Sequence, residues 1–122
     1  MEKQHSEYFE ALTTSVGEEL LKLGISPKFS GYTHLQVGIA AYCTSRILER
    51  KVKFEYSRLS DYFSEPSSVI IQSIRRAIHD AWKNKTEYCL QMFSYRRDLS
   101  EPPTGIEFIT RVSDCVMRTF HT

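Results

Sequence analysis

A stripe of polar and basic side chains in residues 67–83 is the part of this sequence best suited to contacting a charged partner. When the residues are placed at 100° intervals around a helix, short or polar side chains come first along the stripe, cations follow, and no acid lies among them. Amide and guanidinium groups can form paired hydrogen bonds with base edges, and cations can meet phosphates. The candidate DNA-contacting residues are Ser68, Val69, Gln72, Arg75, Arg76, His79 and Lys83.

These side chains are suited to different parts of a DNA duplex. Gln72 can pair with adenine, and Arg75 or Arg76 with guanine. His79 and Lys83 follow further along, where they would meet the phosphate backbone. The solvated side of any long amphipathic helix gives a similar pattern, so the stripe alone leaves both interpretations open.

The stripe belongs to a predicted helix that runs from near Pro66 to Lys83. Pro66 fits a first helical turn, and Ser64 or Glu65 can cap the helix just before it. The face opposite the stripe is apolar, which predicts that it is buried. That face consists of Ile70, Ile74, Ala77, Ile78, Ala81 and Trp82.

A short predicted helix precedes this one, and the two match the plan of a helix-turn-helix over about residues 55–83. The connection from Ser64 to Ser67 is tight. In such a motif the second helix enters the major groove, so we expect double-stranded DNA as the partner. The apolar positions of the short helix are Tyr56, Leu59, Tyr62 and Phe63.

Four further stretches have the 3.6-residue period of helices, and Gly24 and the prolines separate them. No stretch alternates convincingly with period two. The sequence therefore predicts an all-α domain of six helices over residues 1–122. The four stretches run from about 8 to 23, from about 32, from about 86 to 93, and from a capping box at 104–107.

Composition places the chain among ordinary globular proteins, with 41% apolar and 25% charged residues. No apolar run approaches the roughly 18 residues that cross a bilayer, and the N-terminus does not resemble a signal peptide. We therefore expect a cytoplasmic protein without a membrane partner. Cys43, Cys89 and Cys115 are expected to be free thiols used in packing.

Charge is distributed unevenly, although the net charge is only +1. Residues 1–24 carry two lysines against five glutamates, whereas residues 46–97 carry eleven Lys or Arg against six acids. A basic face can therefore exist on a nearly neutral protein, and a surface that is basic by chance would give the same counts.

Other kinds of site have little support. His5, His34, His79 and His121 are scattered, no Cys or His pair has zinc spacing, and His34 is expected on a helix surface. No phosphate-binding glycine loop or nucleophile motif occurs. We predict no enzyme, no metal site, no cofactor and no small-molecule substrate. Arg96 and Arg97 fit a phosphate clamp or a solvated loop equally well.

Four motifs occur in order along the chain. They are Leu-Gly-Ile-Ser-Pro-Lys-Phe-Ser-Gly-Tyr at 23–32, a serine-led helix ending in Ile-x-x-Ala-Trp at 78–82, Phe-x-Tyr at 93–95, and Pro-Thr-x-x-Glu-Phe-Ile at 103–109. With them, residues 8–120 resemble the C-terminal effector domain of the stage zero sporulation protein A family of response regulators. The resemblance implies a six-helix domain that binds promoter elements through a helix-turn-helix, often as a tandem dimer, and controls entry into sporulation.

Two departures from the family pattern change this expectation. Family members have a receiver domain with a phosphorylatable aspartate, and only a few residues precede the first expected helix here, so receiver phosphorylation is not expected to control the chain. The family places base-reading Glu and Arg where this sequence has Ile71 and Gln72; Arg75 matches, and Arg76 replaces a histidine. Either the target sequence differs, or base-specific binding is lost and the chain is a protein-interaction module that binds or antagonises a regulator.

Overall fold

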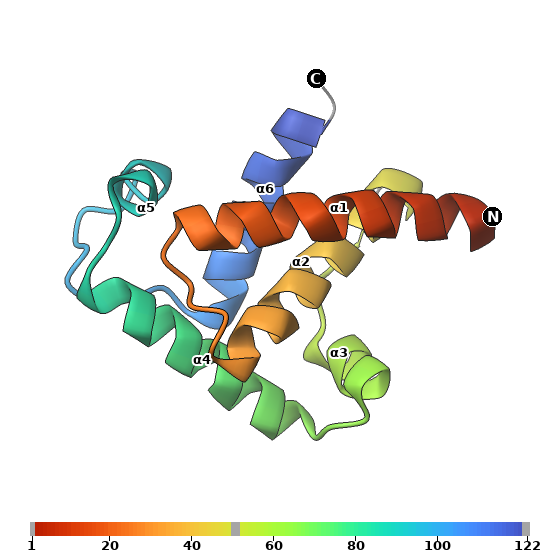
Figure 1. The fold of residues 1–122 in the computed structure, drawn as a ribbon, viewed down its shortest axis with the longest axis horizontal. Helices are drawn as coiled ribbons and strands as arrows, with labels where there is room; N and C mark the ends of the chain where they lie inside the picture. Colours follow the sequence, from red (N-terminus) through yellow and green to blue (C-terminus); the bar gives the residue numbers. More distant parts are fainter. Residues whose placement is uncertain (1, 50–51, 121–122) are drawn as a thin grey trace.

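The helical periods of the sequence become six helices in the computed structural model, which describes residues 2–49 and 52–120 (Figure 1). These two ranges contain no strand, so the all-α prediction is confirmed. The helices are α1 Glu2–Lys22, α2 Ser30–Glu49, α3 Tyr56–Phe63, α4 Ser67–Lys83, α5 Glu87–Met92 and α6 Gly105–Phe120.

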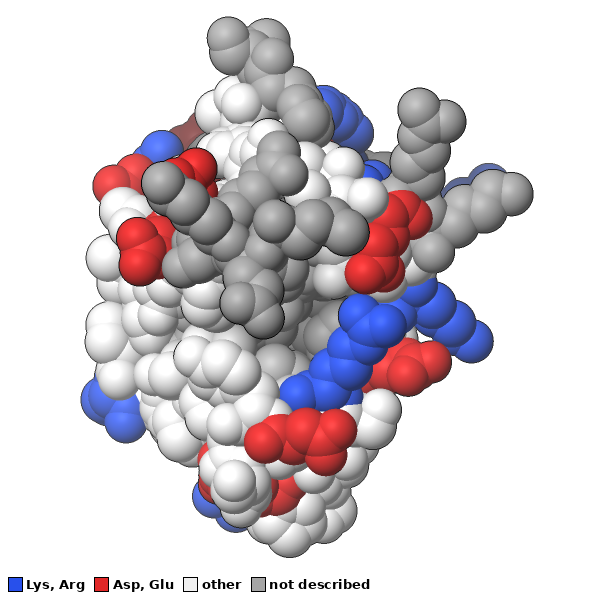
Figure 2. Space-filling model, turned by 90° about the vertical axis from the view of Figure 1, so that its right-hand side faces the viewer, with Lys and Arg blue, Asp and Glu red and all other residues white. Residues whose placement is uncertain are grey.

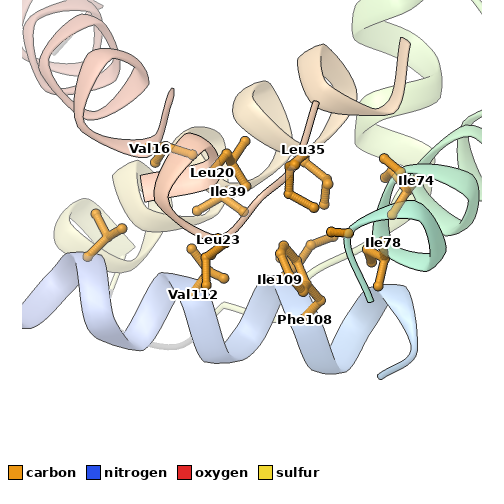
Figure 3. Close-up of a cluster of buried hydrophobic side chains, with 14 of the residues drawn as sticks. Val16, Leu20, Leu23, Leu35, Ile39, Ile74, Ile78, Phe108, Ile109 and Val112 are labelled. Carbon is orange, nitrogen blue, oxygen red and sulfur yellow. The ribbon is translucent and has the colours of Figure 1, made fainter. Parts of the chain in front are cut away.

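Helix α2 is the centre of the fold, because α1, α3, α4 and α6 all pack against it. In Figure 1, α1 crosses α2 while α4 lies against its N-terminal end and α6 passes behind it. Burying a large aliphatic side chain contributes about 1.5–3 kcal/mol, so the core that these helices share holds them in place. Figure 3 labels its members Val16, Leu20, Leu23, Leu35, Ile39, Ile74, Ile78, Phe108, Ile109 and Val112.

Three helix ends have the capping or terminating residue that the sequence predicts. Gly24 follows α1 with a positive φ of 88°, a conformation that glycine adopts without a steric penalty. Thr86 Oγ1 accepts a hydrogen bond from Cys89 N at 3.0 Å and donates to Lys22 O at 2.8 Å, so it caps α5 and ties it to the end of α1. Thr104 Oγ1 likewise accepts from Glu107 N at 3.1 Å.

Three expectations about helices α1 to α3 differ from the structure. Helix α1 begins at Glu2, before the expected start near Tyr8, because its first turns are mostly polar and apolar periodicity cannot mark them. Helix α2 begins at Ser30, two residues before the expected Tyr32. Tyr62 was expected on the apolar face of α3, but it is 62% exposed; Leu59 is the buried residue of that helix.

Cys43, Cys89 and Cys115 are free thiols, and the first two are buried in the core. In the described part of the chain, no helix combines the length and the apolar character that a bilayer crossing requires.

Candidate nucleic-acid interface

Helices α3 and α4 are joined by a turn of three residues, Ser64 to Pro66, as in a helix-turn-helix. Ser64 has a left-handed backbone (φ 53°, ψ 43°), and its N–H donates to Ser60 O. Ser60 Oγ donates in turn to Glu65 O at 2.5 Å. Two successive residues of the turn are thus hydrogen-bonded to Ser60, which fixes the direction in which the chain leaves α3.

The start of α4 differs from the sequence-based expectation. Pro66, with an extended ψ of 143°, stands before the helix and not in its first turn. No side chain caps α4, so the expected cap by Ser64 or Glu65 is wrong. The reason is that Ser64 ends α3, while the Glu65 carboxylate contacts His34. The first amides of α4 are left for water or a partner.

The two faces of α4 are as predicted. Its six buried residues are Ile70, Ile74, Ala77, Ile78, Ala81 and Trp82, all no more than 6% exposed. The opposite face is solvent-exposed and available to a partner. It includes all the candidate DNA-contacting residues, which are Ser68, Val69, Gln72, Arg75, Arg76, His79 and Lys83.

A hollow lies on each side of the exposed stripe of α4. The hollow beside the start of α2 is lined by Phe29, Ser30, Ser68, Val69, Gln72, Ser73 and Arg76. The hollow beside the loop before α6 is lined by Tyr56, Ile71, Arg75, His79 and residues 102–105. The stripe is thus a ridge between two depressions, and Gln72 and Arg75 stand on opposite sides of it.

Two arginines of the basic middle segment form ion pairs with carboxylates. Arg46 is bound to Asp114 at 2.8 Å, and Arg96 lies 3.5 Å from Glu107. Within residues 2–49 and 52–120, Arg75, Arg76 and Lys83 have no carboxylate at ion-pair distance. Figure 2 shows the side of the molecule at the right of Figure 1, where Lys and Arg lie among Asp and Glu. The α4 cations keep their charge available to an anionic partner.

His34 of α2 lies beneath the helix-turn-helix, and its expected position on a helix surface is wrong, because it is only 4% exposed. Its Nε2 is 2.9 Å from Glu65 Oε1 in the turn, and its Nδ1 contacts Ser73 Oγ on α4. The Phe63 ring packs edge-on against the imidazole at 4.6 Å between centroids. One side chain therefore links α2 to the end of α3, to the turn and to α4.

Helix α2 also approaches the backbone of α4 closely at Gly31. A Cβ atom at this position would lie 2.2 Å from Ser73 O and 2.9 Å from Ala77 Cβ. Only glycine permits this approach without a shift of one helix. Gly31 and His34 are three residues apart on α2, so the helix fixes the position of α4 through both residues.

Comparison with known protein families decides the identity of this fold. Residues 16–116 match the model of the family described as Sporulation initiation factor Spo0A C terminal. The chain belongs to this family. A search of curated proteins gave no match. The family assignment makes the chain a sporulation-related, DNA-binding effector domain whose general role is in transcription regulation.

The Spo0A C-terminal family is a DNA-binding family and not a family of enzymes. Ser73, His34 and Glu65 are nevertheless a serine, a histidine and a carboxylate in one chain of contacts. Ser73 Oγ donates to Ile70 O at 2.9 Å, and the imidazole is buried, so these contacts join helices and do not present a nucleophile. In the described part of the chain, no three His, Cys, Asp or Glu residues are grouped to hold a metal ion.

Sequence patterns did not identify His34, Glu65 and Ser73 as residues that position α4 and the turn before it. A signal for His34 was available, because buried residues occur on most sides of α2. A helix surrounded by others must satisfy its polar residues internally. Glu65 and Ser73 gave no such signal, since a glutamate in a turn and a serine beside a polar stripe are usually solvated. Of the four histidines weighed as metal ligands, the side chain of His5 and all of His121 lie outside the described residues.

Proposed function

We propose that the chain regulates transcription in the bacterial cytoplasm by placing α4 in the major groove of a promoter element. The supporting observation is the exposed ridge of α4, whose side chains change from short or polar to basic along the helix, with no acid among them. Ser68, Val69 and Gln72 stand at the N-terminal end, which approaches base edges in helix-turn-helix proteins. The order of side chains along α4, as well as their charge, is thus suited to a DNA groove.

Each side chain of the ridge has a distinct role in this proposal. Gln72 pairs with adenine, and Arg75 or Arg76 pairs with guanine. Val69, 46% exposed, contacts a thymine methyl group. His79 and Lys83 lie later on the helix and meet phosphates, which hold the helix in place without reading sequence. Because Ile71 and Gln72 stand where the family resemblance places base-reading Glu and Arg, the preferred element differs from the usual family target.

A titration of duplex DNA tests the proposal. The preferred element is first selected from random duplexes, and binding is then followed by fluorescence anisotropy against selected and scrambled DNA. Gln72→Ala and Arg75→Ala should each cost about 1–3 kcal/mol on the selected element and much less on scrambled DNA. Lys53→Ala removes one positive charge from an exposed site beside a hollow between α2 and α3 and serves as the control. Failure of every duplex to bind tighter than about 10⁻⁵ M, a non-specific level, contradicts the proposal.

Tandem binding by two copies belongs to the same proposal. A half-site and a tandem pair of half-sites distinguish the possibilities, because a dimer on DNA binds the pair more tightly than two independent copies would. Light scattering of the complexes gives the number of chains on each duplex. One chain per half-site with independent affinities would leave DNA reading intact and remove the tandem arrangement.

Ile71 favours a second candidate function, a protein-interaction module. Its side chain is 40% exposed beside Tyr56, Pro102 and Pro103, an apolar rim next to the ridge. An exposed isoleucine in this position suits an apolar contact with a regulator better than a contact with phosphate or a base edge. Ile71→Glu should abolish binding of a captured partner in this case. If α4 acts on DNA alone, Ile71→Glu should leave the set of captured proteins unchanged.

A further inference from the structure

The turn between α1 and α2 carries a lysine beside the hollow on the α2 side of α4. Lys28 is exposed, and its Nζ lies 5.3 Å from the centroid of the Phe29 ring, which lines that hollow. Ser68 and Gln72 of α4 line the same hollow. Lys28 therefore stands next to the exposed ridge of α4, although it is distant from α4 in the sequence.

Two sets of contacts fix the backbone of this turn relative to α4. Lys28 N donates to Ser26 Oγ at 3.4 Å, and Phe29 N donates to Ser26 O at 3.2 Å. Gly31 follows, and its close approach to Ser73 O leaves no room for a side chain between the two helices. In Figure 1 the connection from α1 reaches α4 at the point where α2 begins. The backbone that carries Lys28 is thus held at a fixed place beside the ridge.

Positive charge at this hollow is not neutralised by nearby acids. Lys28 and Arg76, which lines the hollow, have no carboxylate at ion-pair distance within residues 2–49 and 52–120. Stacking against the Phe29 ring keeps the ammonium group near the hollow and leaves its charge in place. Ser30 also lines the hollow, and its hydroxyl can donate to a phosphate oxygen. The charge and the donors of this hollow therefore suit an anionic partner.

We propose that Lys28 binds a backbone phosphate of the DNA strand that lies over this hollow. The inference rests on the proposed function, because the strand is placed there only when α4 occupies the major groove. That groove is about 12 Å wide, so a helix lying in it has one sugar-phosphate strand on each side. The hollow separates α4 from the start of α2, so Lys28 meets the strand from the side opposite α4.

A phosphate contact at this place has a distinct role. It carries no sequence information, but it fixes the register and the orientation of the protein on the duplex. Gln72 and Arg76 face the same hollow, so the strand that Lys28 holds is the one on their side of α4. Lys28 is therefore a positioning residue for base reading, placed on a segment outside the helix-turn-helix.

The salt dependence of binding tests the charge of Lys28. Lys28→Ala should weaken selected and scrambled duplexes alike and lower the slope of log affinity against log salt by about 0.9. Between about 50 and 200 mM salt, the unchanged chain should thus lose about 3.5-fold more affinity than the variant. Lys28→Arg keeps the charge and should keep the slope. Lys53→Ala is the matched control, since it removes the same charge beside the hollow between α2 and α3 and should leave the slope unchanged.

Methylphosphonate substitution locates the contact on the DNA. Each substitution replaces one charged phosphate of the selected duplex with a neutral group, and the unchanged chain and Lys28→Ala are titrated against the whole set by anisotropy. One position should weaken binding by the unchanged chain about as much as Lys28→Ala does, and it should have no further effect on that variant. The same position should still weaken binding by Lys83→Ala and Lys53→Ala, because their side chains lie elsewhere.

Failure of this inference can be told apart from failure of the proposed function. A slope that Lys28→Ala leaves unchanged, or a fall in slope that Lys53→Ala equals, overturns the Lys28 contact while base reading by α4 stands. Equal responses of the unchanged chain and Lys28→Ala to every methylphosphonate overturn it as well. Absence of binding tighter than about 10⁻⁵ M to any duplex contradicts the proposed function, and the Lys28 contact with it.

Discussion

Trp82 fixes the C-terminal end of α4 in the core. It is 5% exposed, its Nε1 donates to Leu99 O at 2.8 Å, and its ring packs edge-on against Phe93 at 5.3 Å between centroids. The hydrogen bond to Leu99 ties the loop before α6 to α4. One side chain thus joins α4 to the segment that lines one of the hollows beside it.

Replacement of Trp82 tests this anchoring role. Trp82→Ala should lower the free energy of unfolding by about 3–5 kcal/mol, because it leaves a large cavity and an unpaired Leu99 carbonyl. Trp82→Phe is the control, since it keeps an aromatic ring against Phe93 and loses mainly the hydrogen bond. Urea unfolding followed by circular dichroism measures both. A loss below about 1 kcal/mol for the alanine variant would mean that the end of α4 does not depend on this contact.

We expect the three thiols to differ in reactivity because they differ in burial. Burial raises the pKa of Cys43 and of Cys89 to about 11, an effect only partly offset by the hydrogen bond of Cys43 with Ser113 and by the charge of Lys85 near Cys89. The thiolate is the reactive form of a cysteine. With a pKa of about 11, only about one in a thousand of these thiols is ionised at pH 8. Cys115 is partly exposed.

At pH 8 a disulfide-exchange reagent should therefore modify Cys115 first and leave Cys43 and Cys89 protected until the protein unfolds. Absorbance of the released thiolate should show one fast thiol in buffer and all three in urea. Cys115→Ser should remove the fast phase. Rapid reaction of the Cys115→Ser variant in buffer would mean that the core opens locally, since the raised pKa and the burial both predict slow reaction.

At the scale of helices, the crossing of α2 and α4 fixes the orientation of α4. Gly31 allows the backbones to touch, and His34 joins both α4 and the turn before it. Gly17 of α1 provides a contrast, because a Cβ there would meet the ends of the Gln36 and Tyr32 side chains and not a backbone. Flexible ends can move by a few tenths of an ångström, whereas a helix backbone cannot.

Gly31→Ala should therefore lower stability by about 1–3 kcal/mol or more through overpacking, and it should weaken DNA binding by displacing α4. Gly17→Ala should have an effect within about 1 kcal/mol, since the gain in helix propensity offsets the displacement of two side chains. Urea unfolding and anisotropy compare the two variants. Equal effects on both measurements would show that the α2–α4 crossing does not control the interface.

Periodicity in the sequence was enough to predict α4, because its apolar and polar residues lie on opposite faces of the helix. It was not enough for α2, whose surroundings are other helices on most sides. The start of α4 was also mispredicted, since Ser64 can either cap the next helix or end the previous one in a left-handed conformation. Contacts between helices, such as Glu65 with His34, depend on tertiary packing that a local pattern does not contain.

The whole molecule is nearly neutral, with a net charge of +1, so long-range attraction to DNA is weak. The positive charge that matters is local, because Arg75, Arg76 and Lys83 lie on one exposed helix face while Arg46 and Arg96 are paired with carboxylates. The excess of Lys and Arg over acids in residues 46–97 was enough to predict a local basic surface. Which cations remain available depended on the folded structure, since acids distant in sequence pair with some of them.

Lys83 provides a test of this local electrostatics. A phosphate contact releases about 0.9 counterions, so Lys83→Ala should weaken selected and scrambled duplexes alike and lower the slope of log affinity against log salt by about one. Lys53→Ala removes the same charge from an exposed site beside a hollow between α2 and α3, and it should leave the slope unchanged. Anisotropy titrations over a series of salt concentrations measure both slopes. A change of slope equal for the two variants would mean that net charge, and not the face of α4, controls the electrostatic part of binding.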